Sequence, residues 1–207
     1  MSPGNNEKPA ICALLGSPRR QGNTALLLSR AVAGAREAGC TVTTVIVPSL
    51  EFSPCREIYF CRDNDRCKLQ DGITGLYPLF ASLDSLIIAT PVMTMGVPGA
   101  LKSFMDRFQV FYCAKYLRNS PLVAPEKRKY RNTLLISIAG MNLPDNFDGV
   151  RQSAQAFCDI IDCPLTDEIL VRDMDGKKDL NRFPEILDEA YRKGRMLGEH
   201  VVAAVKK

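Results

Sequence analysis

Short apolar runs alternate along the chain with longer segments of helical patterning. The first run, Ala10 to Gly16, is continuously apolar and too short for a helix, which is typical of a strand buried on both faces. Four further runs are also expected to form strands. The expected strands are Ala10 to Gly16, Thr41 to Val47, Ser85 to Thr90, Asn132 to Gly140 and Leu165 to Val171.

Helical segments separate these strands. The expected helices are Thr24 to Gly39, Ile73 to Ser82, Pro98 to Tyr116, Gly149 to Ile161 and Pro184 to Val205. Asn23 or Thr24 can cap the first helix, and Gly39 ends it. Strands that alternate with helices imply right-handed crossovers, so we expect an α/β fold with a doubly wound, five-stranded parallel sheet and helices on both faces. The ligand of such a sheet lies beyond the carboxyl ends of its strands.

The length of 207 residues and the 46% hydrophobic content favour a single domain, residues 1–207, with a sizeable core. No linker or repeat divides the chain, but an irregular, cysteine-bearing insertion spans about residues 48–72. The net charge of +4, from 27 basic and 23 acidic residues, is spread along the chain and predicts no nucleic-acid partner.

The N-terminal sequence lacks the basic start and long apolar stretch of a signal peptide, and no apolar segment approaches the ~20 residues that span a bilayer. We therefore expect a cytoplasmic protein with no membrane partner. In that reducing compartment the eight cysteines are better interpreted as thiols or metal ligands than as a disulfide framework.

The stretch "GSPRRQGNT", after the first strand, crowds potential anion donors into one turn. Unpaired N–H groups and the helix dipole favour a phosphate at such a place. The expected phosphate binders are Ser17, Arg19, Arg20, Gly22, Asn23 and Thr24. The spacing fits neither a Walker loop nor a dinucleotide fingerprint. The alternative is an ordinary strand-to-helix turn with a polar cap.

Two further loops follow the third and fourth strands. In a sheet ordered 2-1-3-4-5 the first and third strands flank the switch point, which places "ATPVMTMGVPG" beside the phosphate loop. Its apolar side chains and backbone N–H groups suit a flat, partly apolar ring. The loop "SIAGMNLPDN" would close the far side of that ring.

In this order and spacing, "GSPRRQGNT", "ATPVMTMGVPGALKSFMDR" and "SIAG" resemble the flavodoxin-like NADPH-dependent FMN reductase family, and specifically its branch containing the iron–sulfur flavoproteins. The resemblance covers about residues 10–200 and implies a flavodoxin-like sheet and FMN as cofactor. It also implies which residues hold the isoalloxazine ring: Pro91, Val92, Met93, Thr94, Met95 and Gly96 along one loop, with Ala139 and Gly140 near the pyrimidine edge.

Chemistry would then come from the flavin, with no catalytic side chain, since FMN itself accepts hydride. The only histidine, His200, is expected at the surface. We expect an oxidoreductase that uses NAD(P)H and passes electrons to free flavin, a quinone or another small acceptor. The alternatives are an iron–sulfur flavoprotein or flavodoxin-like electron-transfer module reduced by a partner protein, and a nonredox phosphate-binding protein.

The insertion matches a four-cysteine [4Fe–4S] motif of the resembling branch only in part. Cys55, Cys61 and Cys67 fit, but Ile58 occupies the second position. A cubane cluster normally takes a thiolate at each iron, so we expect a lost cluster with relict cysteines and [4Fe–4S] to be unlikely. An intact cluster with a substitute ligand, such as Asp63 or Asp65, and another redox or metal role remain alternatives. The other cysteines are expected in the core: Cys12, Cys40, Cys113, Cys158 and Cys163.

The segment from Phe104 to Leu117 has more apolar and aromatic residues than one helix face can bury. This pattern, together with the resemblance, predicts a homodimer or homotetramer. The alternative is a helix buried on two sides within its own subunit.

Overall fold

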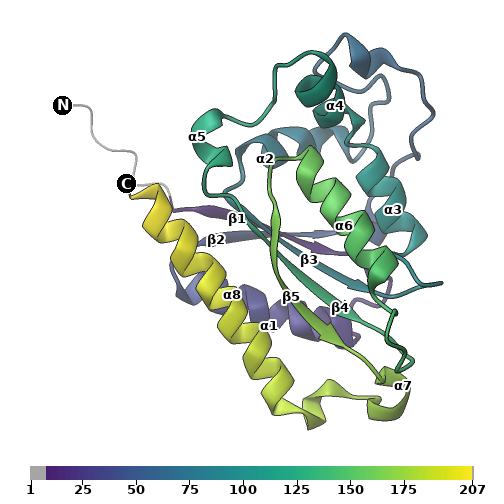
Figure 1. Ribbon diagram of the computed structural model, residues 1–207, viewed down its shortest axis with the longest axis vertical. Helices are drawn as coiled ribbons and strands as arrows, with labels where there is room; N and C mark the ends of the chain where they lie inside the picture. The colour runs from purple at the N-terminus through teal and green to yellow at the C-terminus, as the bar shows by residue number, and fades with distance from the viewer. Residues whose placement is uncertain (1–7, 207) are drawn as a thin grey trace.

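A computed structural model describes residues 8–206 of the chain. Five parallel strands form one sheet in the order β2-β1-β3-β4-β5, which confirms the predicted topology (Figure 1). The strands are β1 (Ala10–Leu15), β2 (Thr41–Ile46), β3 (Ser85–Pro91), β4 (Thr133–Ile138) and β5 (Leu165–Val171). In the register Leu15 lies beside Ala89, and Ala89 beside Ile136, so the carboxyl ends of the three central strands meet at one edge.

Helices cover both faces of the sheet, as predicted (Figure 1). They are α1 (Asn23–Glu37), α2 (Tyr77–Ser82), α3 (Gly99–Asp106), α4 (Gln109–Tyr112), α5 (Pro125–Arg128), α6 (Asp148–Ile160), α7 (Met174–Lys177) and α8 (Pro184–Val205). One buried cluster joins α1 and α8 to the sheet, and the other joins α2, α3, α4 and α6 to the opposite face. These alternate because successive side chains of a strand point to opposite faces: Ile11 and Ala13 belong to the first cluster and Cys12 to the second.

The prediction of a single helix from Pro98 to Tyr116 is wrong, because the helix is interrupted after α3. The Arg107 side chain turns into the protein, and the Arg107 carbonyl accepts a hydrogen bond from the Tyr77 hydroxyl at 2.9 Å. The Phe111 N–H, which a continuous α-helix would pair with that carbonyl, donates to Phe108 O instead. After α4 the chain continues as a π-helical turn over Cys113–Leu117, a form that occurs often at functional sites.

The aromatic residues of this region divide between core and surface. Phe104, Phe108 and Phe111 are buried within their own subunit, whereas Tyr116 and Leu117 are 44% and 51% exposed. Burial on two sides of one subunit therefore accounts for the phenylalanines, and the homo-oligomer stays a prediction. Nowhere in residues 8–206 is a helix both long and apolar enough to cross a membrane.

The insertion of about residues 48–72 lies beside α3 and α4 (Figure 1) and is fixed by two arginines. The fully buried Arg107 guanidinium donates to Ser53 O at 2.6 Å and to the Asp71 carboxylate at 2.7 Å. Arg118 donates to the carbonyls of Cys61 and Arg62. The insertion has little regular structure, so these arginine side-chain bonds fix it in place of the backbone hydrogen bonds that stabilise the helices and strands.

Candidate functional site

The loop after β1 leads into a helix N-terminus that has no side-chain cap. Gly22 is the N-cap residue of α1, with extended backbone, and no described side chain accepts a bond from the first turn. The expectation that Asn23 or Thr24 caps this helix is therefore wrong. The first N–H groups of α1 remain free for an anion, and the helix dipole adds to their attraction.

The Asn23 side chain is occupied elsewhere. Its amide nitrogen donates to Lys178 O at 2.8 Å, and its amide oxygen accepts from Leu180 N at 3.1 Å. Asn23 thus ties the loop between α7 and α8 to the loop after β1. Only its backbone N–H is left to face an anion. The partners lie more than 150 residues away in sequence, and no local signal predicts such a contact.

The two arginines of this loop differ in their surroundings. The exposed Arg20 guanidinium donates to the Ser49 hydroxyl at 2.6 Å. Arg19 is also exposed, and within residues 8–206 its guanidinium forms neither a hydrogen bond nor an ion pair. Ser17 is buried, and its hydroxyl accepts from Arg19 N at 3.2 Å. Arg19 is therefore the cation that is free to turn toward a ligand at the helix N-terminus.

The loop after β3 is a tight hairpin. Met93 and Gly96 exchange two backbone hydrogen bonds, of 2.9 and 3.0 Å. The two residues between them, Thr94 and Met95, have φ values of 49° and 58°. Both lie in the left-handed region that two-residue hairpins require, which costs energy for residues other than glycine, most of all for a β-branched one. Such strain persists only where the surroundings hold it, and it clusters at functional sites.

Two neighbours hold this hairpin in place. Val92 N donates to Ile138 O at 2.7 Å, which fixes the base of the hairpin to the end of β4. Its tip rests on the start of α6, where a Cβ atom at Gly149 would lie only 2.3 Å from Met95 O. Glycine at position 149 is thus what allows the close approach of the tip.

The loop after β4 is fixed by the segment that follows β5. Ala139 is buried and donates to Val171 O at 2.9 Å. Gly140 accepts from Asp175 N, and a Cβ atom at Gly140 would lie 2.7 Å from the Asp175 carboxylate. Four large apolar side chains stay exposed on this loop and the hairpin, namely Met93, Met95, Met141 and Leu143.

The structure therefore brings together the three loops that the sequence singled out. Gly16 N donates to Ala89 O at 2.8 Å, which joins the first loop to the strand that carries the hairpin. The uncapped helix N-terminus fits a phosphate, and the exposed methionines and hairpin backbone fit an apolar ring with polar edges. These features match the chemistry of FMN. The segment after β5, which supports two of the loops, was missed by the sequence analysis.

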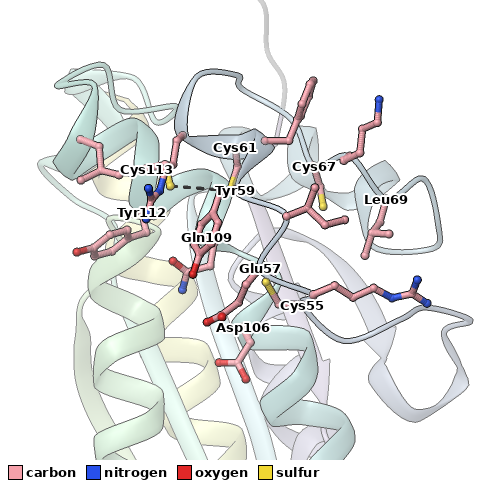
Figure 2. A pocket seen from close by; sticks show the side chains of 16 residues that line it. Cys55, Glu57, Tyr59, Cys61, Cys67, Leu69, Asp106, Gln109, Tyr112 and Cys113 are labelled. Carbon is pink, nitrogen blue, oxygen red and sulfur yellow. Dashed lines mark hydrogen bonds between the residues drawn. The ribbon is translucent and has the colours of Figure 1, made fainter.

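A separate cavity of about 500 Å³ lies between the insertion and α4. Four cysteines line it, Cys55, Cys61, Cys67 and Cys113 (Figure 2). The Cys113 thiol donates to Cys61 Sγ at 3.8 Å, and Arg107 Nη2 donates to Cys67 Sγ at 3.5 Å. Burial, and then the neighbouring Cys113, raise the pKa of the Cys61 thiol to about 11. The Cys61 thiol is thus protonated near neutral pH.

The cysteine motif of the insertion supplies three of the four thiolates that a [4Fe–4S] cluster normally takes, namely Cys55, Cys61 and Cys67. Ile58 is 51% exposed and has no lone pair to offer, and Asp65 is paired with Arg118. Within residues 8–206 no three Cys, His, Asp or Glu side chains lie close enough to hold one ion. The iron content itself stays a prediction.

The other cysteine and histidine predictions are confirmed. All five cysteines expected in the core are buried, although Cys113 also reaches the cavity. His200 is exposed, with Nε2 3.0 Å from Tyr130 O.

Known proteins resemble this chain in sequence. The model of the family described as "NADPH-dependent FMN reductase" matches residues 9–141. An iron–sulfur flavoprotein of Methanosarcina thermophila is 33% identical over 97 residues, which are 47% of this chain and 51% of that protein. The chain spans about half the length of the curated relatives it matches.

Solved structures share the fold. An NAD(P)H:quinone oxidoreductase from Methanothermobacter marburgensis has a TM-score of 0.68 at 18% identity, over 92% of this chain and 97% of that one. A flavone reductase has a TM-score of 0.66 at 17% identity, over 93% of this chain and 62% of that one. At these identities the likeness concerns the architecture alone.

Proposed function

Because the chain belongs to the NADPH-dependent FMN reductase family, in the branch that contains iron–sulfur flavoproteins, we propose that it is an FMN-dependent oxidoreductase. It takes electrons from NAD(P)H and passes them to a small acceptor, such as free flavin or a quinone. The observation that carries this proposal is the uncapped N-terminus of α1 beside the strained hairpin after β3.

Each of the three loops would contact a different part of FMN. The first N–H groups of α1, together with Ser17 and Arg19, would hold the phosphate. The hairpin supplies backbone groups to the ring, and Met93 and Met95 give it an apolar boundary that limits water. Ala139 and Gly140 would lie near the polar edge of the ring. When bound, FMN supplies the two-electron chemistry, so the protein needs no acid–base pair of its own.

Steady-state oxidation of NADPH and of NADH by the purified, FMN-loaded protein tests the activity, with free flavin and a quinone as acceptors. Turnover with either nicotinamide supports an oxidoreductase. A protein that holds FMN but is reduced only by a partner protein would be an electron-transfer module, and a protein that never retains flavin would contradict the proposal.

Replacement of Arg19 by Ala should weaken FMN binding roughly 10- to 100-fold, because a charge-assisted bond to phosphate contributes on the order of 1.5–3 kcal/mol. Quenching of flavin fluorescence on titration measures the dissociation constant. Arg20→Ala is the matched control, and we expect a smaller change, since this guanidinium already bonds Ser49. Equal constants for wild type and Arg19→Ala would show that Arg19 points away from the phosphate.

Replacement of Gly149 by Ala should displace the hairpin tip, because the added Cβ would lie 2.3 Å from Met95 O. We expect FMN affinity to fall about 10-fold, equivalent to ~1.4 kcal/mol, with the fold retained. Gly75→Ala is the control, since beyond its two chain neighbours no atom lies within 4 Å of the added Cβ. Unchanged flavin binding by Gly149→Ala would mean that the hairpin position does not matter for the ring.

A further inference from the structure

We propose that Cys61 and Cys113 form a reversible intramolecular disulfide, which makes the wall of the 500 Å³ cavity a redox modification site. The two thiols come from segments 52 residues apart, yet their sulfurs are 3.8 Å from each other (Figure 2). Cys61 is half-buried and lines an open cavity, so a small reagent can reach it. The proposal does not depend on the proposed flavin function.

The backbone around the pair is held by contacts that leave both sulfurs free. Cys61 lies in a short 3-10 turn, Phe60–Arg62, and Cys113 begins the π-helical turn. Arg118, at the end of that turn, donates to Cys61 O and to Arg62 O and pairs with Asp65. These bonds hold the Cys61 backbone against the helix whether the sulfurs are reduced or oxidised.

A disulfide fits this arrangement better than a bound ion. Sulfurs 3.8 Å apart would also suit one edge of a zinc site, in which each sulfur lies about 2.3 Å from the metal, but such a site needs four ligands. In the described part of the chain no third Cys, His, Asp or Glu joins the pair. A disulfide needs only these two atoms, which must approach to about 2.05 Å. A shift of roughly 1.8 Å is within the reach of rotamer changes in an insertion with little regular structure.

The oxidant is a low-molecular-weight disulfide, such as oxidised glutathione. The Cys61 thiolate attacks one of its sulfurs, which breaks the reagent's S–S bond and releases one thiolate. Cys113, as its thiolate, then attacks Cys61 Sγ and displaces the second. The two protons from the cysteines pass to the two leaving thiolates, so one disulfide and two protein thiols become one protein disulfide and two small thiols. Because the Cys61 pKa is raised to about 11, we expect this exchange to take minutes to hours.

Oxidation would link the insertion covalently to the π-helical turn that follows α4. The bond would close a long loop of chain, and disulfides of this kind raise the melting temperature of a domain of this size by roughly 5–10 °C. Cys158 and Cys163 both contact the Thr133 hydroxyl, but they are fully buried and should not react with an external reagent.

The test uses the full chain, treated with a chelator and then incubated with oxidised glutathione under anaerobic conditions. We expect the link to consume two of the eight free thiols, counted after denaturation, and each glutathione adduct, such as one at the exposed Cys55, to consume one more. Mass spectrometry of a non-reducing digest should show one linked pair of peptides that contain Cys61 and Cys113, and dithiothreitol should separate them. The linked peptide should persist in Cys55→Ser and vanish in Cys61→Ser. Cys113→Ser should instead retain a glutathione adduct at Cys61.

Three results would overturn the proposal. One is glutathione addition at the exposed Cys55 without any Cys61–Cys113 link, because this shows that the reagent worked and the pair did not. Another is a link from Cys61 to Cys55 or Cys67. The third is tight binding of one zinc ion per chain that Cys61→Ser and Cys113→Ser both abolish, with no disulfide in the metal-free protein.

Discussion

Protein purified under anaerobic conditions is expected to carry FMN but far less than the about four irons and four sulfides per chain of a [4Fe–4S] cluster. The reason is that Ile58 stands at the second ligand position of the cysteine motif and has no thiolate to give an iron. Iron and acid-labile sulfide analysis, together with the absorption beneath the flavin bands, measures the content. About four irons per chain in the wild type would contradict this prediction.

Ile58→Cys is expected to restore a cluster that can be reconstituted with iron and sulfide under reducing conditions. Ile58 is 51% exposed, between Glu57 and Tyr59 with φ values of 49° and 61°, so the exchange disturbs a turn and not the core. Iron should rise from a small fraction to about four per chain, because every iron then has a thiolate. Ile58→Ser is the matched control and should stay low. If both variants remain free of iron, the insertion no longer closes around a cluster.

Asp71→Asn should lower the free energy of unfolding by about 3 kcal/mol, because it leaves the Arg107 cation buried without its counter-ion. The Arg107 side chain is 1% exposed, and that of Asp71 is 16% exposed. This value is at the lower end for buried pairs, since asparagine keeps one acceptor. Urea denaturation followed by circular dichroism measures it. Asp106→Asn, which breaks the exposed pair with Lys102, should cost less than about 0.5 kcal/mol.

The same pair predicts how stability depends on pH. Burial favours the neutral form of Asp71, but hydrogen bonds from Arg107 and from the N–H groups of Ser53 and Ile73 hold its pKa below the ordinary range. A lowered pKa in the folded state means that the contribution is complete above about pH 5 and is lost as the pH falls below about 4. The difference between wild type and Asp71→Asn should therefore shrink in acid.

A double variant tests whether the unpaired charge of Arg107, and not a loss of packing, lowers the stability of Asp71→Asn. If the unpaired charge causes the instability, Asp71→Asn combined with Arg107→Met should regain part of the lost stability, because no buried cation remains. A double variant less stable than Asp71→Asn alone would show that Arg107 acts through its other bonds, to Ser53 O and Cys67 Sγ.

The sequence by itself determined the five strands, their parallel direction and the three loops at their carboxyl ends, and the family resemblance added the strand order. The strands and loops follow from local patterns: Ile11 to Leu14 is apolar because both faces of β1 are covered, and "GSPRRQGNT" must follow a strand and precede a helix. Crossover handedness then leaves few topologies open, and parallel strands carry their ligand at one edge.

Tertiary structure alone decided which side chains are free to act. Asn23 is a residue type that caps helices, but it follows the N-cap Gly22, and its amide oxygen accepts from the distant Leu180 N. The segment from Pro98 to Tyr116 has a continuous helical pattern, yet the helix is divided at Arg107. There the Tyr77 hydroxyl bonds the Arg107 carbonyl, and the Asp71 carboxylate binds the Arg107 guanidinium. In the sequence Cys113 looks like any other core cysteine, and only the folded structure shows that the insertion lies against it. Each outcome depends on a contact between segments that are 30 or more residues apart, and local pattern carries no information about such partners.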